Sequence, residues 1–472
     1  MKYISTRGEA APLSFTQTLL HGLAADGGLY LPETYPHFDA AAIAGLAGLS
    51  YAQAAQRVIA PFVDGEIEPD ALAAMIEDAY AGFRHKAVAP LVQLESNLFA
   101  LELFHGPTLA FKDLAMQLLA RLVDHALKAR GQRATVVGAT SGDTGAAAIE
   151  AFAGLAQVDV FILYPHQRVS EVQRRQMTTT GAPNVHAIAL EGSFDDAQGA
   201  VKALFNNRPL RDELGLCGVN SINWARILAQ TVYYFTSAVV LGAPARPVSF
   251  VTPTGNFGDI FAGWIAKRMG LPVERLVIAS NANDILPRAL ASGRYEIGAS
   301  LATQSPSMDI QVSSNFERLL FEAHGRDAGA IRLKMAQLAQ ARAFSLDAGP
   351  LDAVRAEFDA FSVSEPETTA EIARLWRESE YVADPHSAVG LAAARREIFA
   401  RGAATPVVAL GTAHPAKFPD AIEAAIGLRP ALPPHLDGLM EAGERFEIVP
   451  NDQREIERFI RETARVGRKA AS

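Results

Sequence analysis

The sequence predicts an α/β protein that starts with a mainly helical domain. Up to about residue 95, the chain reads as helices joined by short turns. From Leu98 onward, short apolar runs alternate with helical segments, a pattern typical of a parallel sheet whose strands are joined by crossover helices. The chain has 472 residues, of which 49% are apolar, so we expect two or three domains with ample cores.

The N-terminal helical domain is expected to span residues 1–95. Ser50 is a suitable N-cap, and Pro69 suits the first turn of a helix. A Gly-rich turn at 26–28 leads into a short strand. Nothing in this domain carries obvious chemistry. The elements expected here are helices over 11–23, 51–62 and 69–83 and a strand over 29–31.

Several apolar runs after this domain are predicted as strands, and a number of them end in Gly-, Ser- or Thr-rich turns. In parallel sheets, ligands bind beyond the carboxyl ends of the strands, so these turns are the places to look for a site. The predicted strands are Leu98–Phe104, Ala134–Gly138, Val158–Tyr164, Val185–Leu190, Val248–Thr252, Leu276–Ser280 and Val407–Leu410. Mostly helical structure is expected over 328–376, with further helices over 417–427 and 452–466.

The composition excludes several classes of protein. The net charge is −9 and there is no basic stripe, which argues against a nucleic-acid-binding surface. Cys217 is the single cysteine, so no internal disulfide is possible, and its uncharged surroundings predict a buried packing residue. Residues 1–15 lack the apolar core of a signal peptide. We therefore expect a cytoplasmic protein, and nothing in the sequence indicates an obligate protein partner.

One apolar segment, Ile227–Ala245, is uncharged and long enough to cross a membrane. Gln230 and several hydroxyl side chains dilute it, however, and Gly242 and Pro244 end it early. A helix buried in the core is the better interpretation, so no membrane association is expected.

The stretch LFHGPTLAFKDLAMQLL, residues 103–119, places Lys112 at the expected start of a helix. A helix N-terminus disfavours a cation, and the apolar neighbours Phe104 and Phe111 disfavour any charge, so both lower the pKa of Lys112. A neutral lysine is nucleophilic, as a Schiff base requires. Asp113 would raise that pKa, and the local sequence alone favours an ordinary surface lysine.

Two Gly-rich loops each lie between a predicted strand and a predicted helix. They are GATSGDTG, residues 138–145, and PTGNFGD, residues 253–259. Such loops present free N–H groups and the positive end of a helix dipole, which suits a carboxylate or a phosphate. For each loop, an ordinary tight turn is about as consistent with the sequence. Neither has the spacing of a nucleotide-binding motif.

A further loop, residues 410–417, offers the hydroxyl of Thr412 at a strand end. His414 is interpreted as a packed or exposed loop histidine rather than a base. No cluster has metal-ligand spacing, since Asp384 and His386 are too sparse, so no metal is expected. Together the loops suit pyridoxal phosphate, with Lys112 as its Schiff-base lysine, residues 255–259 at its phosphate and Thr412 at its ring nitrogen.

The order of the motifs points to one family. They are FHGPTLAFKD, GATSGDTG, YPHQRVSEVQRRQMT, NSINWARI, PTGNFGD, SMDIQVSSNFERLLFE and GTAHPAKF, preceded by YISTRG and DGGLYLPE. In this order they resemble the threonine synthases, which belong to the tryptophan-synthase-β-like, fold-type II pyridoxal phosphate enzymes. The resemblance extends from Tyr3 to about Gly427 and is weakest across 327–380 and after 430. It implies two open twisted sheets with flanking helices beside the N-terminal domain.

The resemblance also implies roles for individual residues. Lys112 would be the catalytic lysine and carry the cofactor, and Thr412 would bind the ring nitrogen. Asp143 would face the 3′-oxygen of the cofactor, a position where some relatives have Asn. The phosphate of the cofactor would be held by Gly255, Asn256, Phe257, Gly258 and Asp259. The α-carboxylate of the substrate would be held by Thr140, Ser141, Gly142 and Thr144.

The implied reaction is the last step of threonine biosynthesis. It eliminates phosphate from Cγ of O-phospho-L-homoserine and then adds water at Cβ, which gives L-threonine. Lys112 would move several protons in this sequence, which suits its flexible side chain. Because the leaving group is itself a phosphate, a second anion site is needed. Its candidates stay open between His105, Thr108, Arg174, Arg175 and Arg318.

These roles suggest a division of the chain beyond the N-terminal domain. Residues 96–120 and 231–430 would form a large cofactor-binding domain, with a helical insertion over about 327–380. Residues 121–230 would form a smaller mobile domain, because they hold the carboxylate loop and not the phosphate loop. Residues 431–472 would be a C-terminal extension.

Rival interpretations remain at this point. Another lyase with the same cofactor and fold, such as a serine or threonine deaminase, would share most of these residues. A catalytically silent relative that acts as a binding protein is disfavoured because Lys112 and all the loops are retained. A nucleotide-binding module is disfavoured because its motifs are missing.

Overall fold

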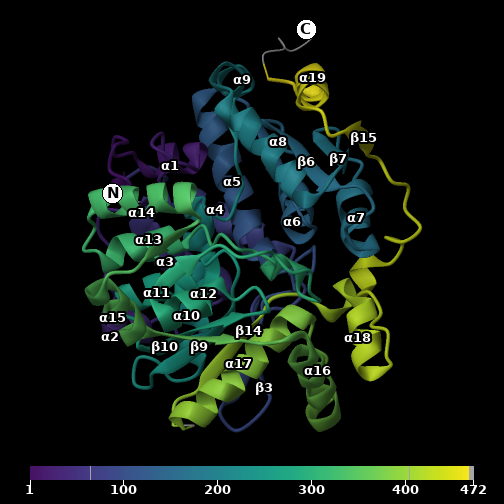
Figure 1. The fold of residues 1–472 in the computed structure, drawn as a ribbon. Coiled ribbons are helices and arrows are strands. Elements are labelled where there is room, and N and C mark those ends of the chain that lie inside the picture. The colour runs from purple at the N-terminus through teal and green to yellow at the C-terminus, as the bar shows by residue number, and fades with distance from the viewer. Residues whose placement is uncertain (64, 403, 467–472) are drawn as a thin grey trace.

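Two open sheets organise the chain (Figure 1). The structure is a computed structural model that describes residues 1–63, 65–402 and 404–466. Within these residues, a six-stranded sheet lies in the lower part of Figure 1 and a five-stranded sheet lies at its upper right. Helices pack on both sheets, so the predicted α/β class with two open sheets is confirmed.

The six-stranded sheet is parallel except at one edge, where β3 pairs antiparallel with β4. Its strand order is β13 (Phe358–Ser362), β10 (Val273–Ser280), β9 (Val248–Pro253), β14 (Val407–Gly411), β4 (Leu98–Glu102) and β3 (Leu91–Gln93). Because β9, β14 and β4 are parallel neighbours, the loops that follow them meet at one edge of the sheet.

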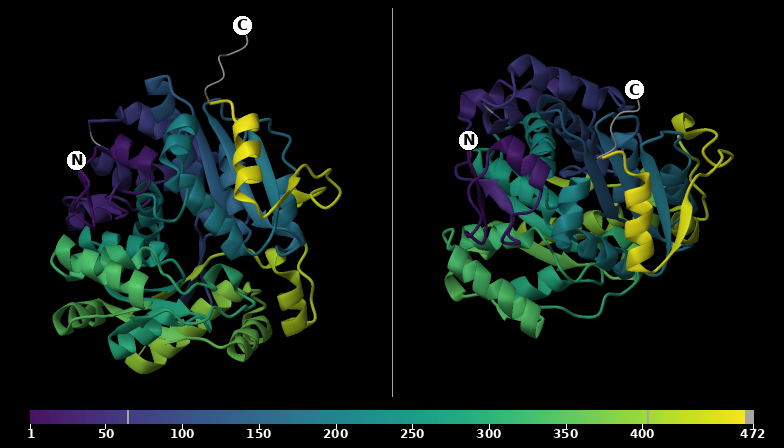
Figure 2. Two further views of the ribbon diagram at one scale, coloured as in Figure 1. Left: turned by 45° about the horizontal axis from the view of Figure 1, so that its top comes forward. Right: turned by 90° about the horizontal axis from the view of Figure 1, so that it is seen from above.

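The five-stranded sheet is parallel throughout. Its strand order is β15 (Glu447–Pro450), β7 (Val185–Glu191), β6 (Val158–Pro165), β5 (Ala134–Ala139) and β8 (Leu216–Cys217). The C-terminal segment supplies the edge strand β15 and a helix that lies against this sheet, drawn in yellow in Figure 2. Residues 467–472 of the predicted extension lie outside the described residues.

All the strands predicted from Leu98 onward are present, but several edge strands were missed. The strand β13 lies in the stretch expected to be mostly helical, and only Phe358 of its residues is fully buried. In β15, only Val449 is buried. A strand at the edge of a sheet is covered on fewer sides, so it does not show the continuous apolar run by which central strands are recognised.

The helices begin and end close to the predicted positions. Two smaller antiparallel sheets of two strands each complete the structure, β1 (Tyr3–Ser5) with β2 (Tyr30–Pro32) and β11 (Arg294–Glu296) with β12 (Ala343–Ser345). The helices are α1 (Phe15–His21), α2 (Ala40–Ala44), α3 (Tyr51–Val63), α4 (Pro69–Ala81), α5 (Lys112–Arg130), α6 (Asp143–Phe152), α7 (Glu171–Thr178), α8 (Phe194–Asn206), α9 (Arg208–Leu214), α10 (Trp224–Val240), α11 (Gly258–Arg268), α12 (Ile285–Ser292), α13 (Phe316–Ala323), α14 (Ala328–Ala341), α15 (Ala348–Glu357), α16 (Glu365–Ser379), α17 (Pro385–Arg401), α18 (Pro419–Ile426) and α19 (Gln453–Thr463).

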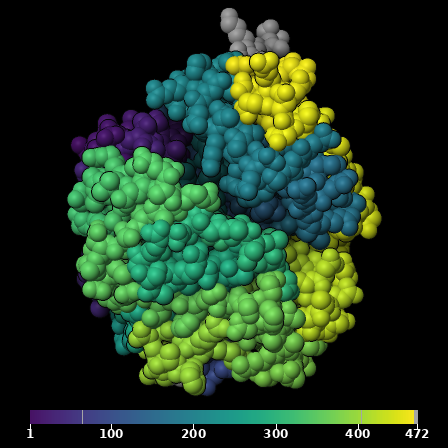
Figure 3. Space-filling model, viewed as in Figure 1, coloured from purple at the N-terminus to yellow at the C-terminus, as the bar shows by residue number. Residues whose placement is uncertain are grey.

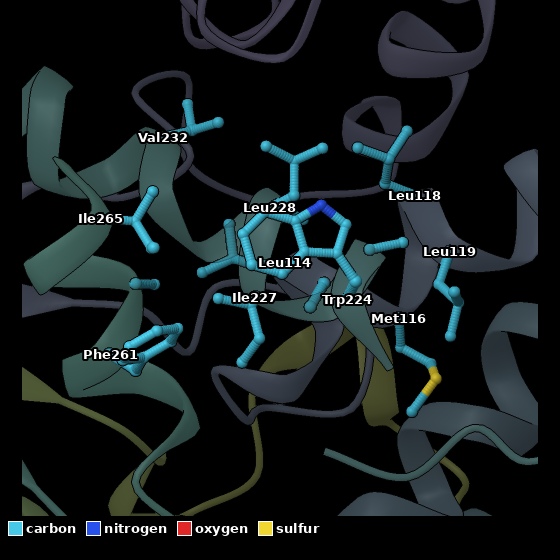
Figure 4. Close-up of a cluster of buried hydrophobic side chains, with 14 of the residues drawn as sticks. Leu114, Met116, Leu118, Leu119, Trp224, Ile227, Leu228, Val232, Phe261 and Ile265 are labelled. Atoms are coloured by element: carbon cyan, nitrogen blue, oxygen red, sulfur yellow. The ribbon is translucent and has the colours of Figure 1, made fainter. Parts of the chain in front are cut away.

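The helices α5 and α10 pack against each other at the centre of the largest core (Figure 4). Leu114 and Leu118 of α5 lie near the buried Trp224 of α10, and Phe261 of α11 lies at the other side of the cluster, near Ile265. The ring of Trp224 also contacts Tyr3 at 5.9 Å between centroids. The N-terminal helices therefore share one core with the helix that carries Lys112.

The apolar segment that raised the question of a membrane is α10, and the prediction of a core helix is confirmed. Nearly all its side chains are buried within the protein. Among the residues that the structure describes, no helix is both long and apolar enough to span a bilayer. Cys217 is also buried as predicted, and burial raises the pKa of its thiol to about 12.

Candidate active site

The lysine loop and the Thr412 loop are fastened together by backbone hydrogen bonds. The Phe111 N–H donates to the Thr412 carbonyl at 2.9 Å, and the His414 N–H donates to the Leu109 carbonyl at 3.0 Å. Lys112 follows as the first residue of α5, as the sequence predicted. The register of two neighbouring strands, β4 and β14, thus fixes where Lys112 and Thr412 lie relative to each other.

Lys112 is buried and lies beside one carboxylate. Its Nζ is 3.1 Å from Oδ2 of Asp143 and 3.3 Å from Oγ of Ser307. Burial lowers the pKa of Lys112, the charge of Asp143 raises it, and the charges of Lys417 and Arg226 lower it further. The net direction is downward, which is the direction that the sequence predicted for a reactive lysine.

The expectation that Asp113 would raise the pKa of Lys112 is wrong. The carboxylate of Asp113 turns back onto Thr108 and accepts hydrogen bonds from its N–H at 2.8 Å and its hydroxyl at 2.6 Å. Burial raises the pKa of Asp113 itself to about 6. Gly106 leaves room for this arrangement, since a Cβ there would lie 2.6 Å from the Cβ of Asp113. Asp113 therefore shapes the loop, and Asp143 is the partner of the lysine.

Asp143 is held between two lysines. It is the first residue of α6, and its Oδ1 lies 2.8 Å from Nζ of Lys417, a side chain with 0% exposure. The Nε2 of Gln173 donates to the same oxygen at 2.9 Å. Although burial raises the pKa of Asp143, the charges of Lys112 and Lys417 hold it well below its usual range. Sequence reasoning missed Lys417, although it lies in one of the motifs.

The predicted carboxylate loop is a tight turn at the N-terminus of α6. The hydroxyl of Thr140 accepts hydrogen bonds from the N–H groups of Gly142 and Gly145, both at 2.9 Å, so it serves the loop itself. Gly142 has a φ of 141°, and a side chain there would overlap Gln173. Ser141 and Thr144 remain partly exposed beside the helix N-terminus, where an anion is favoured.

The predicted phosphate loop is the N-terminus of α11. Phe257 is its N-cap with a φ of 63°, and the N–H groups of the first turn have no partner within the helix. The side chain of Asp259 does not face this loop. Its Oδ1 accepts from the hydroxyl of Tyr233 at 2.5 Å and that of Tyr234 at 3.0 Å, both on α10. Burial raises the pKa of Asp259 to about 6.

A buried carboxylate, Asp384, supports two of the site residues at once. It accepts hydrogen bonds from the Ser387 hydroxyl and, at 2.7 Å, from Nδ1 of His386. The Nε2 of His386 then accepts the N–H of Ser307 at 3.2 Å, and the hydroxyl of Ser387 accepts the N–H of Thr412 at 3.0 Å. Asp384 and His386 were considered in the sequence only as a metal pair, and the described residues contain no group suited to a metal ion.

Arg226, near the start of α10, is a buried guanidinium that sequence reasoning missed. Its Nη1 donates to the Val219 carbonyl at 3.1 Å, while its Nε has no partner among the described residues. Burial lowers the pKa of Arg226 to about 10. Arg226, Lys112 and Lys417 are three basic side chains, whereas Asp143 is the one carboxylate that pairs with the two lysines. The site therefore has an excess of positive charge. Bound anions would balance it, which fits a cofactor and a substrate that each carry a phosphate.

The side chains expected to hold the substrate phosphate are engaged elsewhere. Arg318 is fully buried and donates to the backbone carbonyls of Tyr30 and Ile222. The remaining pairs are Arg174 with Glu444, Arg175 with Glu171, Thr108 with Asp113, and His105 with Glu102. Of these cations, none has the unpartnered buried nitrogen that Arg226 has within the described part of the chain.

The site lies between the two sheets. Figure 3 shows that this face of the molecule is hollowed between the blue segments of the five-stranded sheet and the green segments of the six-stranded sheet. An amine of lowered pKa, two helix N-termini and the buried Thr412 meet there. These groups suit a phosphorylated carbonyl cofactor with a ring nitrogen, which is the chemistry of pyridoxal phosphate.

Three family models match successive parts of the chain. Residues 2–80 match the threonine synthase N terminus, and residues 84–344 match the pyridoxal-phosphate dependent enzymes. Residues 387–460 match the threonine synthase C-terminal model. The prediction that the cofactor is pyridoxal phosphate is therefore confirmed.

Similar proteins cover nearly the whole chain. A threonine synthase from Pseudomonas aeruginosa is 52% identical over 98% of both chains, and one from Saccharomyces cerevisiae is 42% identical over 90% of this chain and 89% of its own. A structure of a threonine synthase from Brucella melitensis with pyridoxal phosphate bound has a TM-score of 0.96 at 57% identity. That match covers 98% of this chain and 100% of the other. With such similarity along its full length, the chain belongs to the threonine synthase family of pyridoxal-phosphate-dependent enzymes.

Proposed function

We propose that this protein is a threonine synthase that converts O-phospho-L-homoserine and water into L-threonine and phosphate. The observation that carries the proposal is the buried Lys112, whose pKa is lowered at a site with an excess of positive charge. Full-length similarity to threonine synthases supports the same substrate. We further propose a cytoplasmic enzyme that works without an obligate protein partner.

Each group of the cofactor has a partner in this arrangement. Lys112 would bind its carbonyl carbon, and the backbone N–H groups of residues 255–259 would bind its phosphate. The hydroxyl of Thr412 would meet the ring nitrogen, and Asp143 would face the 3′-oxygen. When bound, pyridoxal phosphate withdraws electrons from the Cα of an amino acid, which makes its protons removable.

Lys112 is the group that moves protons. Its lowered pKa favours the neutral form that can act as a base, and its flexible side chain can reach both Cα and Cβ of the substrate. Ser307 and Asp143 hold Nζ on one side of the site and limit its positions. Asp143 stays ionised, so it can stabilise Lys112 each time the lysine carries a proton.

The two anionic ends of the substrate would be held separately. Ser141 and Thr144 at the N-terminus of α6 would take the α-carboxylate, as the resemblance predicted. The guanidinium of Arg226 would take the phosphate, since its Nε is buried without a partner. A fixed cation at the leaving group stabilises the charge that develops there as phosphate departs.

Closure of the site would follow from its position between the sheets. We propose that residues 121–230 move as a smaller domain toward the larger one, made of 96–120 and 231–430. Asp143 and the carboxylate loop lie in the smaller part, while Lys112 and the phosphate loop lie in the larger part. Closure would keep bulk water out until the hydration step.

The first test is the reaction itself. The purified protein with pyridoxal phosphate should release phosphate from O-phospho-L-homoserine and form L-threonine in equal amounts, since elimination and hydration occur in one site. Both products are measured in parallel assays. A deaminase would instead form a 2-oxo acid from L-serine or L-threonine and no phosphate. A silent binding protein would give neither result.

The role of Arg226 is tested by Arg226→Gln. Loss of a buried, charge-assisted hydrogen bond costs roughly 1.5–3 kcal/mol, so KM for O-phospho-L-homoserine should rise about 10- to 150-fold. Arg246→Gln, at an exposed arginine after the same helix, is the matched control and should leave KM unchanged. An unchanged KM in Arg226→Gln, with thermal stability retained, would place the phosphate elsewhere.

Closure is tested by a second structure with a phosphonate analogue of the substrate bound. The distance between Ser141 and Gly255 should shorten as the carboxylate loop moves toward the phosphate loop. The same distance in both structures would show that the two parts of the chain form one rigid unit.

A further inference from the structure

A cavity of about 510 Å³ lies behind the lysine loop, apart from the site described above. It is lined by four segments of the chain: the region of Arg84, the loop from Glu102 to Leu109, the loop at His414, and residues 433–435 of the C-terminal segment. Its lining includes neither Lys112 nor Thr412. A cavity of this size is large enough for a small ligand.

Arg84 supplies an uncompensated positive charge at this cavity. Its side chain is exposed, and among the described residues it forms no ion pair with a carboxylate. Its backbone N–H donates to the His105 carbonyl at 2.9 Å, which fixes the residue beside the loop. His435 lines the same cavity, and burial and the charge of Arg84 lower its pKa.

The one carboxylate in the lining is already satisfied. Oε2 of Glu102 lies 2.8 Å from Nε2 of His105, and Glu102 also accepts a hydrogen bond from Tyr381. It therefore does not compensate Arg84. The unpaired charge in the lining of the cavity is therefore the positive charge of Arg84.

Two imidazoles complete the polar wall. Nδ1 of His414 accepts the N–H of Ala416 at 3.1 Å, so a neutral His414 carries its proton on Nε2 and can donate it. Nε2 of His435 is buried without a partner in the described part of the chain. Once protonated, it too would be a donor. The remaining wall is apolar and consists of Phe104, Leu109 and two prolines.

We propose that this cavity binds a small organic anion, with a carboxylate or phosphate head group on an apolar body. The head group accepts hydrogen bonds from Arg84, from His414 and from protonated His435. The apolar body packs on Phe104 and Leu109. Neither a metal ion nor a cationic ligand suits a wall whose only carboxylate is already paired.

The position of the cavity links its ligand to the catalytic loops. Leu109 and His414 line the cavity and are joined by a backbone hydrogen bond of 3.0 Å. A second backbone hydrogen bond between the same two loops joins Phe111 to Thr412, and Lys112 follows directly. A ligand here contacts the segments that set the position of Lys112 without touching the substrate.

Binding should strengthen as the pH falls. Burial and the charge of Arg84 lower the pKa of His435, and a bound anion raises it again, so binding takes up a proton. Burial and His105 lower the pKa of His414 to about 4, although Glu102 and Asp384 raise it, so His414 stays neutral. His435 is thus the group that makes the affinity depend on pH.

The test is calorimetric titration of the cofactor-loaded enzyme with benzoate and with phenyl phosphate. Benzoate should bind about tenfold more tightly near pH 6 than near pH 8, because protonated His435 adds a charged donor. Arg84→Ala should weaken benzoate binding at least tenfold, and His435→Ala should remove the pH dependence. Arg208→Ala, at an exposed arginine on α9, is the matched control and should bind as the parent does. The tighter of the two probes identifies the preferred head group.

The variant Ser141→Ala separates this cavity from the proposed substrate site, and it should bind both probes as the parent does. If Arg84→Ala binds them as tightly as the parent, or if Ser141→Ala abolishes binding, the cavity is not the binding site. Absence of binding near pH 6 at millimolar probe also overturns the proposal. Arg84 is exposed, so its replacement should not disturb folding, and thermal denaturation of the variant checks this.

Discussion

The carboxylate of Asp143, held between Lys112 and Lys417, is the interaction on which the site depends. Asp143 follows strand β5 of the five-stranded sheet, and the two lysines follow strands of the six-stranded sheet. A buried charge is costly unless it is paired, so this cluster links the two sheets at the site. Because Lys112 and Lys417 share the single carboxylate of Asp143, the site also keeps a positive charge that favours the phosphates of cofactor and substrate.

The same cluster explains how a lysine can be both buried and reactive. Burial lowers the pKa of Lys112, and Asp143 limits that effect so that the lysine can still take up a proton. Lys417 competes for the same carboxylate and weakens its hold on Lys112. The Asp384 network adds a second constraint, because it positions both Ser307 and Thr412 from one helix N-terminus. Catalytic precision here rests on two buried carboxylates, Asp143 in a strand-end loop and Asp384 at the N-terminus of α17.

Much of the fold could be predicted because its signals are local. Central strands such as Val158–Tyr164 are continuous apolar runs, and the start of α5 at Lys112 follows from the turn before it. Edge strands such as β13 could not be predicted, since each gains its place only by pairing with a neighbour. The downward direction of the pKa of Lys112 was predicted correctly from its apolar surroundings, but the carboxylate that opposes it is Asp143 and not Asp113, which turns back onto Thr108. Arg226, Ser307 and Lys417 lie within the quoted motifs, but they join the site only through tertiary contacts, so the local sequence did not reveal their roles.

Lys112, and not the more deeply buried Lys417, is the residue proposed to bind the cofactor. The most direct measurement is borohydride reduction of the cofactor-loaded enzyme, followed by proteolysis and mass spectrometry of the labelled peptide. The account predicts a pyridoxyl group on Lys112 alone, and no label in Lys112→Ala. A label on Lys417, or retention of the label in Lys112→Ala, would contradict it.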